Sequence, residues 1–127
     1  MKHALLILTL LFMSACSTTN HRAPRTALIG HIVFIDLKQN SDYDALLRDS
    51  NEMLATIPSV RTYAAGRHID TGRDTIINDY DLAIYLGFES IEDLNAYVIH
   101  DQHIAYVTKW KPRFESLRVY DMHDTTE

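Results

Sequence analysis

The chain of 127 residues is long enough for one domain and too short for two. Apolar residues make up 46% and charged residues 23%, a balance that is typical of a folded domain and argues against disorder. The formal net charge of −5, without a basic stripe, argues against a nucleic-acid-binding protein. A single cysteine excludes an internal disulfide bond and a cysteine-based zinc finger.

The first 15 residues have the features of a targeting segment and not of a folded element. Lys2 supplies a positive charge, and an apolar run follows from Ala4 to Met13, interrupted only by Thr9. A helix that spans a bilayer needs roughly 20 apolar residues, so this run is too short to be a permanent anchor. We therefore interpret residues 1–15 as a signal peptide.

The end of this run, Met13-Ser14-Ala15-Cys16, resembles the lipobox of bacterial lipoproteins, in which the cysteine becomes the lipidated first residue. The alternative is an ordinary secretory signal peptide beside an unrelated cysteine. We favour lipidation of Cys16, because the only cysteine lies where lipidation requires it. Residues 16–29 would then tether a domain over residues 30–124 to a membrane. The domain would lie in the periplasm or at the cell surface. Ser17, and not Asp, follows the cysteine, which by resemblance to lipoprotein sorting in Gram-negative bacteria favours the outer membrane.

The remaining sequence predicts strands and helices in the order β-α-β-β-α-β. One helix is predicted from a capping box at Ser41–Asp44 to Pro58, and another from a capping box at Ser90–Asp93. A further helical stretch over 100–114 is disturbed at Pro112, and residues 70–74 predict a turn. The predicted strands are residues 30–38, 60–69, 79–88 and 117–122.

This order of elements is that of the ferredoxin-like fold, an α+β architecture with a four-stranded antiparallel sheet and helices on one face. Side chains alternate along a strand, yet the strands at 30–38 and 79–88 carry apolar residues on both faces. A sheet with one solvated face should instead alternate apolar with polar residues. We therefore expect a homodimer in which two sheets pack face to face as a dimeric α/β barrel. The alternative is a monomer with a half-exposed sheet.

Several short segments between about residue 30 and residue 122 form a combined pattern: His31–Phe34, Ile57-Pro58 with Val60 and Gly66, Phe88–Ser90, Tyr97–His103 and Val119–Asp121. This pattern resembles the stress-responsive α/β-barrel (Dabb) domain family. The chain departs from the family pattern at Asp101, where a proline usually follows the first histidine of a pair. The resemblance implies ferredoxin-like subunits that pair into a barrel.

The resemblance also implies a site in the cavity between the sheet and the helices. One characterised member is a plant polyketide cyclase, which closes a linear poly-β-ketone by aldol condensation without a cofactor. Its catalytic histidine and tyrosine match His103 and Tyr97. An imidazole can accept a proton next to a carbonyl near neutral pH, and a phenol can donate a hydrogen bond to the enolate oxygen. The expected ligand-binding residues are His31, Leu46, Ile84, Leu86 and His100.

Three functions follow as hypotheses. The one we favour is a lipid-anchored module that binds a small, mostly apolar molecule in a pocket polarised by His31 and His103. The second is a cofactor-free lyase or cyclase, with His103 as base and Tyr97 as acid. The third is a cofactor-free monooxygenase, and we expect no cofactor in any of them.

The candidate site residues also have structural interpretations. Tyr97 can be a core aromatic, and the pair His100 and His103 can orient a helix end and a subunit contact. The same pair with Asp101 could ligate a metal, but no third ligand is apparent from the spacing, and we expect no metal.

Overall fold

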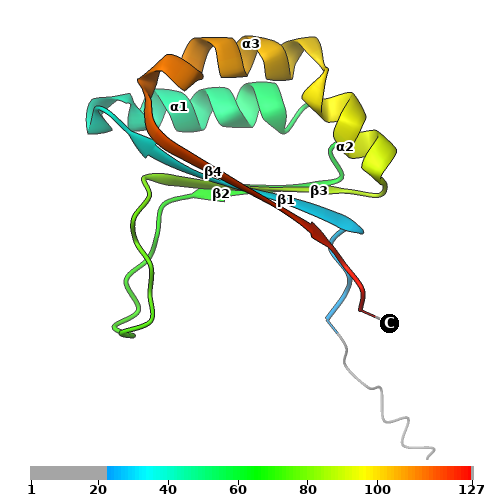
Figure 1. Ribbon diagram of the computed structural model, residues 1–127, viewed down its shortest axis with the longest axis horizontal. Helices are drawn as coiled ribbons and strands as arrows, with labels where there is room; N and C mark the ends of the chain where they lie inside the picture. Colours follow the sequence, from blue (N-terminus) through cyan, green and yellow to red (C-terminus); the bar gives the residue numbers. More distant parts are fainter. Residues whose placement is uncertain (1–22, 127) are drawn as a thin grey trace, which may run out of the picture.

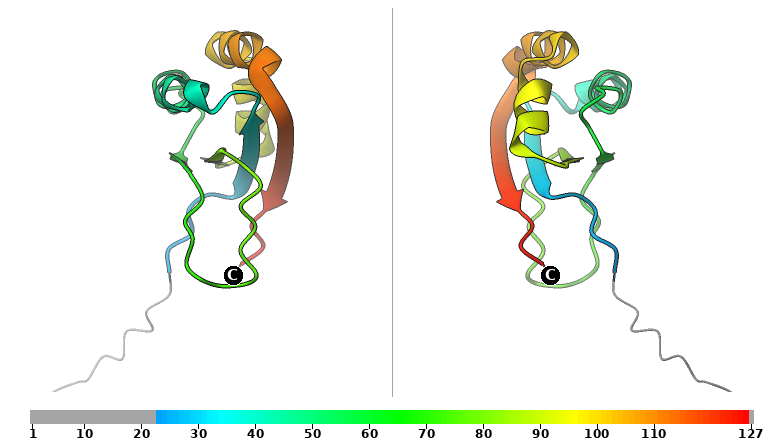
Figure 2. Two further views of the ribbon diagram at one scale, coloured as in Figure 1. Left: turned by 90° about the vertical axis from the view of Figure 1, so that its left-hand side faces the viewer. Right: turned by 90° about the vertical axis from the view of Figure 1, so that its right-hand side faces the viewer.

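The computed structural model describes residues 23–126, so the predicted signal peptide and Cys16 lie outside the described residues. A four-stranded antiparallel sheet carries the helices on one face, and Figures 1 and 2 show both layers from three sides. The predicted ferredoxin-like fold is confirmed. Within residues 23–126, no helix has the length and apolar character that crossing a membrane requires.

The sheet is built on β1 (Ile29–Leu37), which pairs with both β3 (Leu82–Phe88) and β4 (Phe114–His123). The strand β2 (Thr62–Gly66) lies at the edge beyond β3, so the strand order is β2-β3-β1-β4. All four predicted strands exist. The second and third are shorter than predicted, because residues 60–61 and 67–69 lie outside β2 and residues 79–81 lie outside β3. The fourth begins three residues earlier than predicted.

The first predicted capping box is wrong. The chain enters α1 (Tyr43–Asp49) through a 3-10 turn, η1 (Asn40–Asp42), so its backbone already turns before a cap could act. The cap residue Asp42 has helical dihedral angles, and its carboxylate accepts a hydrogen bond from Arg113 at 2.9 Å instead of capping the helix. The helix continues as a π-helical segment, η2 (Ser50–Leu54).

The second predicted cap is confirmed. Ser90 is extended, and its hydroxyl accepts a hydrogen bond from the Asp93 amide at 3.1 Å, which starts α2 (Ile91–Val98). The chain then breaks at His100, whose extended backbone separates α2 from α3 (Asp101–Trp110). A 3-10 turn, η3 (Lys111–Arg113), follows with Pro112 near its start, and leads into β4.

A buried carboxylate holds α3 to α1. Asp49 is 6% exposed, and its Oδ2 accepts hydrogen bonds from Lys109 and from the indole Nε1 of Trp110, the latter at 3.0 Å. Burial alone would raise the pKa of Asp49, but the hydrogen bonds from Lys109 and Trp110 outweigh it and hold that pKa below its usual value. Asp49 therefore stays ionised and fixes the position of α3 above the sheet.

The face of the sheet opposite the helices is also apolar, as the alternation predicted. Its side chains include Phe34, together with Tyr120 at 55% and Met122 at 50% exposure. Residues 67–81 form an arm that leaves the sheet on this side (Figure 1). The arm covers only part of the face, where the ring of Tyr80 packs against Phe34 with centroids 4.9 Å apart.

The two serines of the predicted capping boxes give a matched test of helix capping. We expect Ser90→Ala to lower the free energy of unfolding by about 1 kcal/mol, because it leaves the Asp93 amide without its partner. Ser41→Ala should have no measurable effect, since the Ser41 side chain makes no capping bond to α1. Urea denaturation of the two variants measures both values. Equal losses would contradict this assignment of the caps.

Candidate functional site in the cavity between α3 and the sheet

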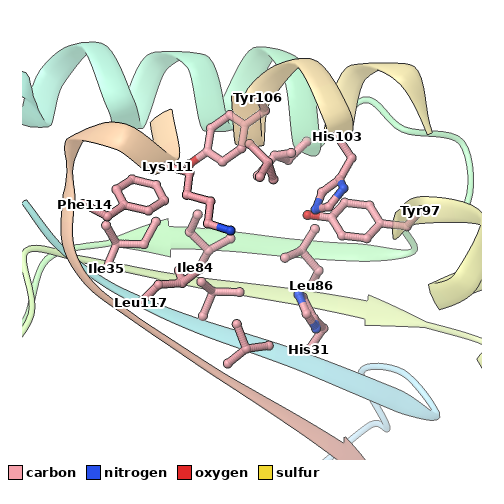
Figure 3. Close-up of a pocket in the computed structure, with 14 residues that line it drawn as sticks. His31, Ile35, Ile84, Leu86, Tyr97, His103, Tyr106, Lys111, Phe114 and Leu117 are labelled. Atoms are coloured by element: carbon pink, nitrogen blue, oxygen red, sulfur yellow. The ribbon is translucent and has the colours of Figure 1, made fainter. Parts of the chain in front are cut away.

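A cavity of about 80 Å³ lies between α3 and the helix-bearing face of the sheet (Figure 3). Its walls are mostly aliphatic and come from β1, β3, β4 and η2. The polar groups on its surface belong to two histidines, two tyrosines and one lysine. Five of the residues predicted for the site line it: His31, Ile84, Leu86, Tyr97 and His103.

His103 presents one ring nitrogen to the cavity. Its Nδ1 lies 2.8 Å from the carbonyl oxygen of Val98, and a carbonyl only accepts, so Nδ1 carries the proton. Nε2 is therefore the basic nitrogen of the ring. Burial lowers the pKa of His103; the hydrogen bond to Val98 opposes this shift, and nearby His31 adds to it. The imidazole is thus neutral at pH 7 and able to accept a proton.

Tyr97 brings a protonated phenol to the same place. Its ring lies 4.6 Å from the ring of His103 and 5.3 Å from that of Phe88, measured between centroids. Burial raises the pKa of Tyr97 well above its usual value, so the hydroxyl remains a donor. Figure 3 shows this hydroxyl pointing into the cavity beside His103, and it forms no hydrogen bond with any residue of 23–126.

His31 lies across the cavity on β1 and is oriented by an acidic partner. Its Nδ1 is 2.6 Å from Oδ1 of Asp121, which stands opposite it on β4. The carboxylate of Asp121 accepts a hydrogen bond from Nδ1–H of His31, which fixes the orientation of the imidazole ring. The His31 side chain is 12% exposed and that of Asp121 58%, so the carboxylate lies at the rim.

Sequence reasoning missed Asp121, Tyr106 and Lys111. Tyr106 follows His103 by three residues and so shares its helix face, a spacing that could have revealed it. Its hydroxyl is already engaged, 2.8 Å from the Ser50 hydroxyl, which in turn donates to the carbonyl of Leu46. Asp121 follows Leu117 and Val119 on one face of β4, but only the strand register pairs it with His31.

Two predicted site residues do not line the cavity. Leu46 is fully buried in the core. His100 caps α3, since its Nδ1 accepts a hydrogen bond from the Gln102 amide at 3.2 Å. The structural interpretation of the histidine pair, in which it orients a helix end, therefore holds for His100. No group of three His, Cys, Asp or Glu residues within 23–126 is placed to hold a metal ion.

The family model of the stress responsive A/B barrel domain, Dabb, matches residues 29–124. The chain belongs to the Dabb family. The match begins with β1 and ends just after β4, so it covers the whole sheet and helix layer of this Dabb protein. No protein of curated function matches its sequence.

Solved structures share the fold of this Dabb protein at low sequence identity. A Dabb family protein from Mesorhizobium loti is 24% identical over 77% of this chain and 97% of its own, with a TM-score of 0.65. A dimeric ferredoxin-like protein of unknown function from Thermobifida fusca is 20% identical over 76% and 90%, with a TM-score of 0.63. A hydroxynitrile lyase from Passiflora edulis is 16% identical over 81% and 99%, with a TM-score of 0.68.

Proposed function

We propose that this Dabb protein binds a small, largely apolar molecule in the cavity between α3 and the sheet. The observation that carries the proposal is an apolar cavity into which the Tyr97 hydroxyl points, with no hydrogen-bond partner among the described residues. Its volume of about 80 Å³ is roughly half that of the 150 Å³ engineered cavity that takes benzene. A molecule with a body of a few non-hydrogen atoms fits this space better than a long poly-β-ketone chain does.

The pairing of His103 with Tyr97 favours a second function, cofactor-free lyase chemistry on a small carbonyl compound. Nε2 of the neutral His103 can accept a proton from a substrate, while the Tyr97 hydroxyl donates a hydrogen bond to the oxygen on which negative charge develops. A hydroxynitrile lyase is among the proteins that share the fold, which supports lyases as candidates. Monooxygenase chemistry stays an untested alternative.

Turnover of small aldehydes, ketones and cyanohydrins by site variants tests both functions. We expect His103→Ala and Tyr97→Phe each to lower kcat/KM by about 10²–10⁴-fold, the usual contribution of general acid–base groups. Tyr63→Phe is the control, because its hydroxyl donates to Asn51 at 3.0 Å and does not line the cavity.

The pH profile of kcat/KM carries further information in the same experiment. The pKa of His103 lies below the usual 6.5, and the base acts in its neutral form. The rate should therefore rise as pH increases through a pKa below 6.5 and be lost in acid. Binding without turnover in the wild type would reject the lyase and keep the binding function. Failure to bind any of these compounds would reject both.

We also propose that the protein is a homodimer that pairs through the apolar face opposite the helices. Leaving large apolar side chains in water forgoes about 1.5–3 kcal/mol each, and the arm of residues 67–81 covers only part of this face. The description of the Thermobifida protein as dimeric supports the same arrangement. Pairing would join two sheets into one barrel and leave each cavity on the helix side of its own subunit.

A charge placed on this face tests the dimer. Ile32→Asp should convert the protein to a monomer, because Ile32 lies on the same face as Phe34, between Tyr85 and Tyr120, and a carboxylate buried there without a cationic partner opposes association. The control is Ile99→Asp, which changes a residue that is 74% exposed after α2 and should leave the dimer intact. Sedimentation of the full chain in detergent at micromolar concentration measures both. A monomeric wild type would refute the proposal.

We propose, finally, that lipid on Cys16 anchors the protein in the cell envelope on the periplasmic side, with the outer membrane favoured. The position of the only cysteine after Met13-Ser14-Ala15 supports this. Two or three acyl chains hold a protein firmly on a membrane, at roughly 0.8 kcal/mol per buried CH₂.

Metabolic labelling in a bacterial host tests the anchor. Cys16→Ser should abolish incorporation of labelled palmitate and release the protein from the membrane fraction, whereas Ser17→Ala should keep both. Unlabelled wild-type protein would show that the segment is an ordinary signal peptide.

A further inference from the structure

Lys111 is the one lysine or arginine among the residues that line the described cavity. It is the first residue of η3, where the chain turns from α3 toward β4. Figure 3 shows its side chain descending from the helix layer, with the ammonium group pointing into the cavity. The side chain thus brings a positive charge to a space whose walls are mostly aliphatic.

The ammonium of Lys111 has no partner among residues 23–126, unlike the lysines near it. Lys109 bonds to the buried carboxylate of Asp49, and Lys38 donates to the carbonyl of Pro112 at 3.0 Å. The described residues that line the cavity include no aspartate or glutamate. Lys111 is exposed, so water solvates its ammonium, and an anionic group on the occupant would gain a charge-assisted hydrogen bond there.

The free polar groups of the cavity lie in two places. Figure 3 places Tyr97, His103 and His31 together at one end, whereas the side chain of Lys111 starts near Phe114 and brings its ammonium above Ile84. Leu86 lies on the sheet between the ammonium and the histidines. A matching occupant has a carbonyl or hydroxyl at one end and a short apolar middle, which enter the cavity, and an anionic group at the other end, which stays in contact with solvent beside the exposed Lys111.

We infer that the cavity selects a short-chain oxo acid, whose carboxylate pairs with Lys111 while its carbonyl oxygen faces Tyr97 and His103. The inference rests on the proposed binding function and deepens it by naming the class of ligand. An ammonium and a carboxylate form a charge-assisted hydrogen bond, whereas a neutral group of the same shape does not. Lys111 then decides specificity, and the His103 end holds the carbonyl.

The test compares two probes that differ in charge and hardly in shape, 4-oxopentanoate and 4-oxopentanamide. Dissociation constants come from NMR titration of the full chain in detergent. We expect the wild type to bind the acid roughly three- to tenfold more tightly than the amide at low salt, as for a partly exposed charged pair. Added salt at 1 M, where charges are screened beyond about 3 Å, should shrink this preference.

Variants separate Lys111 from the charge of the whole protein. Lys111→Met keeps the aliphatic stem and should lower affinity for the acid to that for the amide, without changing amide binding. Lys111→Arg should restore a preference for the acid. Arg73→Met removes one positive charge on the exposed arm, away from the cavity, and should change neither constant.

The outcomes distinguish the inference from the function on which it rests. Equal affinity for acid and amide in the wild type, or no effect of Lys111→Met, overturns the carboxylate assignment and leaves the binding function intact. Failure of both probes to bind overturns both. A mass increase after borohydride treatment with 4-oxopentanoate, located on Lys111 by peptide mapping, would show an imine there and would also overturn ion pairing.

Discussion

The break between α2 and α3 is the constraint on which the site depends. His100 adopts an extended backbone and caps α3 with its own Nδ1, so the chain changes direction between Val98 and Asp101. This turn brings the Val98 carbonyl within 2.8 Å of Nδ1 of His103. One hydrogen bond then fixes the tautomer and leaves Nε2 as the basic nitrogen. A continuous helix would satisfy the Val98 carbonyl with a backbone amide, and the imidazole would lose this restraint.

The cavity exists because α3 is held in place independently of any ligand. The buried carboxylate of Asp49 accepts from Lys109 and Trp110 near the end of α3, and Ser50 links Tyr106 to α1. These bonds join helices that lie far apart in sequence, and the Tyr97 hydroxyl takes part in none of them. A rigid helix above an apolar sheet can keep a small space open, since the surrounding side chains cannot collapse into it.

The two faces of the sheet carry different sets of side chains. One face supports the cavity and presents His31, while the other carries apolar side chains that the arm covers only in part. Strand alternation makes this division possible, since neighbouring residues of β1 such as Val33 and Phe34 point to opposite faces. Association and ligand binding would therefore use separate surfaces of one sheet. A charge on the outer face can change assembly without removing a group from the cavity.

The sequence by itself determined the order of the strands and helices, the apolar character of both sheet faces and the cap at Ser90. These features follow from local pattern, since side-chain periodicity and capping involve residues close in the chain. Its resemblance to known proteins also pointed to Tyr97 and His103. The contact between His31 and Asp121, which are 90 residues apart, required the register of β1 on β4. Only the tertiary structure decided where the Lys111 side chain points. It also decided that a 3-10 turn, and not a capping bond from Ser41, starts α1. Both features depend on how α1, α3 and β4 pack together.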